Sequence, residues 1–431
     1  MGEQAVRCVR GMKDLLPADS RIFTAIEGEM RRVFGSFGFC EIRTPLVEET
    51  RLFSRGIGEE TDIVSKEMYT FPDRDGSLLT LRPEGTASAV RAYIEHSFDR
   101  SDPVQRWYYT GAMFRHERPQ KGRYRQFHQI GAESFGVADP FADAELIHML
   151  LVFMAALKVA GVALRINSLG CPVCRPAFRE KLRTFMESRA AELCDDCKRR
   201  IVTNPLRVLD CKQERCIAAT AGAPASSENL CQECAVHFTG VQNALAAFGD
   251  TWSVDNRMVR GLDYYNRTTF ELLATDPEAG AQNAVAGGGR YDALVEMLGG
   301  RATPAVGFAI GLERLRMLVA GAGDPALPAV SVFILAGSRA TIREAATLAS
   351  VLRGRGIPVE LDGTDRGFKA KFKRADKSGA RIAVIIGEDE AARGTCAVKS
   401  MTSAMLPGGE KQAEIALGAA ADFVQGTLNV L

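Results

Sequence analysis

The densest group of residues that could do chemistry lies in residues 114–136. Five cations fall within eleven positions there, around a turn-like segment at residues 119–122: Arg115, Arg118, Lys121, Arg123 and Arg125. Guanidinium groups are permanently charged forks that match phosphate oxygens, so two strands that carry them to one cleft would make a polyphosphate site. A solvated loop with internal salt bridges would show the same pattern, so both interpretations stay open at this point.

Polar residues and further arginines accompany this group. Gln129 and Glu133 are four positions apart on the second predicted strand, so they face the same side and could form a polar pocket. Arg260 comes before Gly261 and a pair of tyrosines, Tyr264 and Tyr265. In residues 307–315 a predicted strand turns into a helix that carries Glu313 and Arg314. Taken alone, either segment could be ordinary packing.

The elements that must position these residues follow from hydrophobic periodicity. Helices are predicted at residues 22–34 and 141–160, and strands at residues 39–44, 77–82, 105–114, 127–135, 252–260, 268–274 and 303–310. We expect little helix between the strands at 77–82, 105–114 and 127–135, which favours an antiparallel sheet. After a linker at 321–328, strands at 330–336, 357–361 and 382–386 alternate with helices at 340–353 and 366–377. That alternation predicts a separate α/β domain.

Composition limits the class of protein. The chain has 431 residues, 46% hydrophobic, and 54 basic against 53 acidic side chains, for a net charge of +1. A protein that binds polyanions over its whole surface is therefore excluded, and a nucleic-acid partner would need local basic patches. No secretory signal or membrane-length apolar run is found, so we expect a cytoplasmic protein without a membrane partner.

Eight of the 11 cysteines lie in a segment at about residues 170–240, which we interpret as an insertion. It contains three CxxC pairs. The first two pairs are 19 residues apart, which fits a four-cysteine structural zinc site at Cys171, Cys174, Cys194 and Cys197. The isolated Cys8, Cys40 and Cys396 are expected to be small buried hydrophobic residues.

Taken together, these segments resemble the motifs of the histidyl-tRNA synthetase family, a class II aminoacyl-tRNA synthetase family. Residues 41–50, 114–133 and 307–315 are similar to class II motifs 1, 2 and 3. RGLDYYNRTTFE (260–271) and AGGGRYD (286–292) resemble the two histidine-specific signatures, and LRPEGT (81–86) completes the set. The resemblance implies an α+β fold: a catalytic domain at 1–325 with a six-stranded antiparallel sheet and a helical, cysteine-rich insertion, and an anticodon-binding α/β domain at 326–431.

The resemblance also implies the activity, which is ATP-dependent attachment of L-histidine to tRNA(His) through histidyl-adenylate. The substrate carboxylate is the nucleophile, so positioning and charge neutralisation do the catalysis. Arg115 and Arg260 would be the catalytic residues, at the α-phosphate. ATP would be bound by Arg115, Glu117, Arg123 and Arg314. Histidine would be bound by Glu84, Gly85, Thr86, Gln129, Glu133, Arg260, Tyr264 and Tyr265, with Glu133 and Tyr264 reading the imidazole nitrogens.

The remaining implications concern partners and cofactors. Lys369, Lys373 and Lys377 share one helix face, which favours a contact with the RNA backbone over a merely solvated helix. A homodimer is expected through the helix at 22–34, and Mg²⁺ is expected with ATP. The family is not known for an obligatory zinc, so the resemblance argues against the zinc site. The alternative functions are a non-catalytic regulatory paralogue of histidine biosynthesis and a class II synthetase for another amino acid. A zinc-ribbon nucleic-acid module would explain only the insertion.

Overall fold

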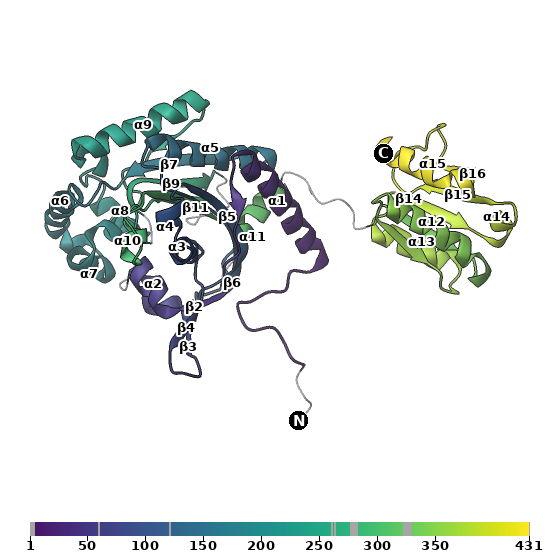
Figure 1. Cartoon of the computed structure of the whole chain (residues 1–431), viewed down its shortest axis with the longest axis horizontal. Helices are drawn as coiled ribbons and strands as arrows, with labels where there is room; N and C mark the ends of the chain where they lie inside the picture. Colours follow the sequence, from purple (N-terminus) through teal and green to yellow (C-terminus); the bar gives the residue numbers. More distant parts are fainter. Residues whose placement is uncertain are drawn as a thin grey trace. The chain divides into compact units, whose positions relative to one another are not determined.

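The structure, a computed structural model, describes residues 5–58, 61–119, 122–259, 262, 264–275, 283–321 and 330–430. The chain divides into two compact units, Met1–Pro325 and Ala326–Leu431 (Figure 1). Within the described ranges, none of the helices combines the length and the apolar character that a membrane span requires.

The first unit is built on a sheet with eight strands among the described residues, in the order β1-β5-β6-β11-β10-β9-β7-β8. The inner six strands pair antiparallel throughout, as the sequence predicted, but the short edge strands β1 and β8 pair in parallel with β5 and β7. The bounds are β1 Cys40–Glu41, β5 Gln105–Phe114, β6 Gln126–Phe135, β7 Val162–Ser168, β8 Ser253–Val254, β9 Asn266–Ala274, β10 Ala284–Arg290 and β11 Ala305–Gly311.

Helices cover both faces of this sheet. Successive residues of a strand face opposite sides, so neighbouring side chains of β5 pack against different helices. On one face, Tyr108 of β5 packs against Phe34 of α1 (Pro17–Ser36), with ring centroids 5.7 Å apart. On the other face, Trp107 packs against Tyr93 of α3 (Thr86–Glu95) at 5.9 Å. Helix α5 (Pro140–Ala156) lies on the α1 side, and α9 (Gln232–Phe248) packs against its outer surface (Figure 1).

Local sequence explains where two of the helices beside the sheet begin, α5 and α3. The side chain of Asp139 accepts a hydrogen bond from the Phe141 amide at 2.8 Å, and Pro140 occupies the first turn of α5, where a missing amide hydrogen costs nothing. Helix α3 begins one residue after Gly85, and its first amides bond to the Glu84 carboxylate. The start of α3 is thereby fixed at the edge of the candidate site.

Shorter elements complete the first unit. A three-stranded sheet has the order β2-β4-β3. The bounds are β2 Val47–Glu49, β3 Tyr69–Pro72, β4 Leu78–Leu81, α2 Thr50–Ile57, α4 Phe98–Ser101, α10 Leu294–Met297 and α11 Leu312–Gly321.

The segment between β7 and β8 is mainly helical and has a hydrophobic core of its own, which includes Phe178, Leu182 and Ile201. Its helices are α6 Arg175–Glu187, α7 Asp195–Thr203, α8 Glu214–Ala219 and α9. The predicted zinc set is wrong as one group, because α6 carries the chain away from Cys171 and Cys174 before it reaches Cys194 and Cys197. Each pair instead meets a different second pair: Cys231 and Cys234 join the first, and Cys211 and Cys216 join the second.

Two other expectations fail for identifiable reasons. The strand predicted at 252–260 stops at Val254, because Asp255 forms a turn in which its side chain accepts from the Arg257 amide and its carbonyl from the Met258 amide. Cys8 and Cys40 are exposed rather than buried, whereas Cys396 is buried as expected.

The second unit is an α/β domain with the strand order β13-β12-β14-β15-β16. Strands β13, β12 and β14 are parallel, and β15 and β16 continue the sheet antiparallel. The bounds are β12 Val332–Ala336, β13 Val359–Asp362, β14 Ile382–Ile386, β15 Thr395–Ser400, β16 Gln412–Ala416, α12 Ile342–Gly354, α13 Phe368–Ser378, α14 Glu388–Ala392 and α15 Leu417–Val430. Both faces of β12 are buried, as expected for a central parallel strand.

Candidate active site

A cavity of about 350 Å³ lies on the α3 side of the large sheet. Two residues paired across neighbouring strands leave its floor open because they are small: Ala309 of β11 and Gly287 of β10. Glu271 of β9 ends this row. The triple glycine of the AGGGRYD signature therefore lies in a sheet strand beneath the cavity, rather than in a loop that closes over a ligand.

Three arginines line one part of the cavity, and they come from different elements. Arg115 follows β5, Arg123 lies in the β5–β6 connection, and Arg314 lies on α11. Glu117 is a carboxylate close to two of them: it accepts from Arg123 at 3.0 Å and lies 4.0 Å from Arg115. Burial lowers the pKa of Arg314, and the like charge of Arg123 lowers it further. The group therefore carries excess positive charge that an anionic ligand would stabilise.

The arginines are held in place by uncharged and charged neighbours. The Nε atom of Arg115 donates to the Pro83 carbonyl at 2.9 Å, and its guanidinium lies 5.3 Å from the ring centroid of Phe127. Arg314 donates to the Ala284 carbonyl at 2.6 Å. Its neighbour Glu313 accepts from the backbone amide and ring of His128 on β6. Helix α11 is thereby attached to the strand that follows the arginine-bearing connection.

The LRPEGT segment supplies the opposite wall of the cavity. Glu84 and Thr86 line it, and the Glu84 carboxylate accepts from the Thr86 and Ala87 amides at 2.5 and 2.8 Å. Burial raises the pKa of Glu84, while these two amides and Arg115 oppose the rise. Gly85 does not line the cavity; a Cβ there would meet the ring of Tyr109 at 2.2 Å, so only glycine allows this packing.

Glu133 lies behind the cavity wall rather than in it, and its side chain is fully buried. It accepts from Thr86 Oγ1 at 2.8 Å, from the Tyr109 hydroxyl at 3.0 Å and from the Tyr291 hydroxyl. Burial raises its pKa to about 8, against the opposing effect of the Tyr291 and Thr86 hydroxyls. A contact between Glu133 and a bound imidazole therefore stays a prediction, because the side chain does not line the cavity.

Gln129, Tyr264 and Tyr265 complete the polar end of the cavity. The amide oxygen of Gln129 is buried and has no hydrogen-bond partner among the described residues. The two tyrosine rings lie 4.6 Å apart, and burial raises the pKa of Tyr264 well above its ordinary value. A buried acceptor without a donor is rare in folded proteins, so Gln129 marks a place where a ligand donor fits.

The two histidine-specific signatures are bonded to each other. Asn266, in the middle of the first, donates to the Asp292 carboxylate and accepts from the Asp292 amide, both at 2.9 Å. Asp292 also accepts from Arg290 at 3.0 Å, and Arg290 forms a fully buried ion pair with Asp143 of α5. The pocket tyrosines are thus attached through Asn266 to a buried charge network beneath the sheet.

Arg260, the residue predicted at the α-phosphate and the histidine carboxylate, lies outside the described residues, as do Gly261 and Asp263. Its neighbours Tyr264 and Tyr265 line the cavity. The roles assigned to Arg260 therefore stay predictions.

Several cavity residues were not singled out from the sequence. Phe127 and Tyr124 add aromatic surface, and Glu271 adds a carboxylate. Period-two alternation with Gln129 could have found Phe127, since both lie on β6. Arg125 does not line the cavity. Its amide donates to the Gly11 carbonyl, and its side chain donates to the carbonyls of Arg10 and Glu117.

In the second unit, the basic helix separates into exposed and buried cations. Lys371 is buried and donates to the Ala336 carbonyl, and Arg374 pairs with Glu360 and Asp362. The three lysines predicted to bind RNA are exposed on α13: Lys369, Lys373 and Lys377.

The sheet, with arginines brought to one cavity from the β5–β6 connection and α11, defines a class II aminoacyl-tRNA synthetase core. Residues 11–315 match the family model described as histidyl-tRNA synthetase, and residues 330–427 match an anticodon binding domain. The chain belongs to the histidyl-tRNA synthetase family.

Similar proteins agree with this membership. A histidine–tRNA ligase of Geobacter sulfurreducens is 50% identical over 393 residues, which are 91% of this chain and 94% of the relative. One of Desulfosudis oleivorans is 50% identical over 414 residues, 96% of each chain. The crystal structure of apo histidyl-tRNA synthetase from S. aureus has a TM-score of 0.79 at 34% identity and covers 98% of this chain and all of that one.

Proposed function

We propose that this chain attaches L-histidine to tRNA(His) in two steps, using ATP and releasing pyrophosphate and AMP. One observation carries the proposal: a single cavity joins three crowded guanidinium groups to a polar end with an unpaired buried acceptor. An anionic polyphosphate fits the first part, and an amino acid with an ammonium group fits the second. Histidyl-adenylate would span both.

The adenylation step requires no nucleophile from the protein. The histidine carboxylate attacks the α-phosphorus of ATP and forms a new P–O bond. The bond between the α-phosphorus and the oxygen that bridges to the β-phosphorus breaks, and pyrophosphate leaves with that oxygen. Arg115 would bind the α-phosphate, while Arg123 and Arg314 would bind the γ-phosphate end. Arg260 would hold the α-phosphate and the carboxylate in line. Positioned charges of this kind stabilise the extra negative charge of the transition state more than that of the ground state.

Recognition of histidine uses the polar end of the cavity. Gln129 and Glu84 would accept from the α-ammonium group, with Gly85 and Thr86 fixing the wall beside it. Glu133 and Tyr264 would read the two imidazole nitrogens, one a donor and one an acceptor in the neutral ring. Tyr265 would cover the ring. An amino acid that left these buried groups unpaired would be rejected strongly.

Aromatic and acidic neighbours suit the rest of ATP. The Phe127 ring and Arg314 lie in the same cavity and could sandwich the adenine, since purines stack on aromatic and guanidinium planes. Glu117 and Glu271 offer the hard oxygen donors that Mg²⁺ prefers, so these residues fit a magnesium ion bound with ATP. Bound there, magnesium would neutralise charge on the departing pyrophosphate.

The second step needs tRNA. The exposed lysines of α13 would contact its backbone in the anticodon region, which leaves base reading to nearby strands and loops. We expect a homodimer formed through α1 and the strand after it, acting in the cytoplasm. The regulatory-paralogue alternative is less well supported, because such paralogues typically lack an anticodon domain and the intact RGLDYYN segment, and this chain has both.

The test is histidine-dependent exchange of pyrophosphate into ATP by the parent protein and by R260A. Exchange with histidine alone among the amino acids is expected, with kcat lowered about 10²–10³-fold in R260A. R316A is the matched control: Arg316 lies on the same helix as Arg314 but pairs with Asp19 outside the arginine group. If well-folded parent protein gives no exchange, the enzyme assignment fails and the regulatory alternative takes its place.

A further inference from the structure

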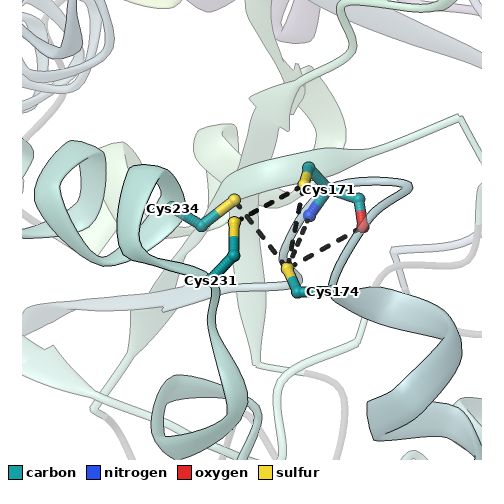
Figure 2. A group of neighbouring side chains, drawn as sticks. All are labelled: Cys171, Cys174, Cys231 and Cys234. Atoms are coloured by element: carbon teal, nitrogen blue, oxygen red, sulfur yellow. Dashed lines mark hydrogen bonds between the residues drawn. The ribbon is translucent and has the colours of Figure 1, made fainter.

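The eight cysteines of the insertion form two separate groups of four among the described residues. In each group all four sulfur atoms lie within 4.8 Å of one another. We call them the junction cluster, which consists of Cys171, Cys174, Cys231 and Cys234 (Figure 2), and the inner cluster, which consists of Cys194, Cys197, Cys211 and Cys216.

The sulfur spacing matches a single tetrahedral metal ion. In the junction cluster the Cys171 sulfur lies 3.8 Å from those of Cys174 and Cys231, and the sulfurs of Cys174 and Cys234 are 3.9 Å apart. In the inner cluster the Cys194 and Cys211 sulfurs are 4.0 Å apart. A zinc ion about 2.3 Å from each of four tetrahedral thiolates places them about 3.8 Å apart. A disulfide would require about 2.05 Å.

Backbone amides already point at these sulfur atoms. The Cys171 amide donates to the Cys174 sulfur at 3.2 Å, and in the inner cluster the Cys194 amide donates to the Cys216 sulfur at 3.2 Å. The Cys197 amide donates to the Cys194 sulfur at 3.4 Å. Such outer contacts orient metal-binding thiolates and stabilise their charge. A glycine is also required beside the junction cluster: a Cβ on Gly170 would lie 2.6 Å from the Cys174 sulfur.

We propose that the insertion binds two structural zinc ions, one in each four-cysteine cluster. Each site has four protein ligands and therefore no open position for a substrate, so neither metal takes part in adenylation. Binding one Zn²⁺ to four thiols forms four Zn–S bonds and releases up to four protons, and no electrons are transferred.

The two sites have different structural consequences. The junction cluster joins the loop after β7 to the start of α9, so it brings together the chain before α6 and the chain after α8 (Figure 2). Arg175, next to Cys174, donates to the Tyr265 carbonyl, and the Arg267 amide donates to the Gly170 carbonyl at 2.8 Å. The junction cysteines are therefore positioning residues for the histidine pocket. The inner cluster instead lies within the hydrophobic core of the insertion.

The first experiment measures metal in full-length protein purified without added metal or chelator. Elemental analysis should give two zinc ions per chain. A thiol reagent under native conditions should modify only the exposed Cys8 and Cys40, because Cys396 is buried and the eight cluster cysteines hold zinc. The eight cluster cysteines should react once the zinc is displaced. Fewer than about 0.2 zinc ions per chain would overturn the proposal, as would a mass spectrum with disulfides among the eight. Stoichiometric iron in place of zinc would overturn the choice of metal.

Cysteine variants test whether each cluster binds one zinc ion. C171S/C231S and C197S/C211S should each keep one zinc ion, and C8S/C40S, which changes only exposed thiols, should keep two. If a cluster variant does not fold, Co²⁺ exchanged into the parent protein gives the answer instead: two equivalents should show the absorption of tetrahedral cobalt thiolate. One equivalent, or none, would contradict two sites.

The positioning role rests on the proposed function and is tested separately from metal content. In folded C171S/C231S, the KM for histidine in pyrophosphate exchange should rise several-fold while the KM for ATP changes little, because Tyr265 lies at the histidine end. C197S/C211S should show the parent KM values. Equal effects on both substrates would refute the positioning role but leave the zinc count standing, whereas absence of exchange in the parent would refute only the enzyme assignment.

Discussion

Replacing Glu133 by glutamine should change how the stability of the catalytic unit depends on pH. Burial raises the pKa of Glu133 to about 8, from 4.5 for an exposed glutamate. The folded protein therefore keeps a proton that the unfolded chain loses between pH 4.5 and 8. Below pH 4.5 both states are protonated, and Glu133 contributes nothing. As pH rises through this window, the free energy of unfolding falls by about 1.4 kcal/mol per unit, and above pH 8 it falls no further.

The magnitude follows from the difference between the two pKa values. A shift of about 3.5 units corresponds to roughly 5 kcal/mol, of which about 3 kcal/mol develops between pH 5.5 and 8. In E133Q this part of the slope disappears. Any loss of stability that comes from placing an amide opposite the Thr86, Tyr109 and Tyr291 hydroxyls does not depend on pH. It therefore shifts the plot of unfolding free energy against pH without changing its slope. Titrating groups that do not interact with Glu133 cancel in the difference.

Urea unfolding followed by tryptophan fluorescence measures this difference directly. Both tryptophans, Trp107 and Trp252, lie in the first unit, so the signal reports on the catalytic unit alone. E296Q, which removes an exposed carboxylate, is the matched control and should follow the parent curve. Parallel curves for E133Q and the parent between pH 5.5 and 8 would refute the reasoning, because they would mean that folding does not change the proton affinity of Glu133.

The remaining predictions test the ligand site, the buried network and the tRNA contact. If the imidazole donates to Glu133, histidine binding near pH 7 should release close to one proton; calorimetric enthalpies that do not vary with the ionisation enthalpy of the buffer would contradict this. R290M should lose about 3–5 kcal/mol of stability by leaving Asp143 buried without its cation, and adding D143N should restore part of the loss. Replacing the three exposed lysines Lys369, Lys373 and Lys377 by glutamate should slow aminoacylation of tRNA without affecting pyrophosphate exchange. Equal losses in both assays would exclude a tRNA-specific role for these lysines.

Long, strongly patterned elements could be predicted from the sequence to within a residue or two. The strands at 105–114 and 382–386 have the predicted bounds, because runs of aromatic and branched residues end at clear turn signals. The cavity residues Arg115, Arg123, Arg314 and Gln129 were all named in advance and are brought together by the fold. Side-chain chemistry at recognisable spacing was enough for these positions.

What could not be predicted depends on contacts between distant segments. The strand Ala284–Arg290 contains three glycines and has no side-chain pattern, so only its pairing with β9 and β11 makes it a strand. Glu133 was expected in the pocket, but three hydroxyls from α3, β5 and the end of β10 surround it, and periodicity does not contain that information. The cysteine pairing failed for the same reason, since spacing cannot tell which pairs the helices bring together.

The meeting of the two ends of the insertion has a consequence for protein engineering. Cys174 and Cys231 are separated by 56 residues in the chain, yet their sulfur atoms belong to one cluster. A segment whose entry and exit are adjacent can be exchanged as a cassette, because a short turn can bridge the same gap. The helices between these cysteines could therefore be deleted or replaced by a foreign domain while β7 and α9 keep their places, which would yield a smaller first unit or one with a new appendage.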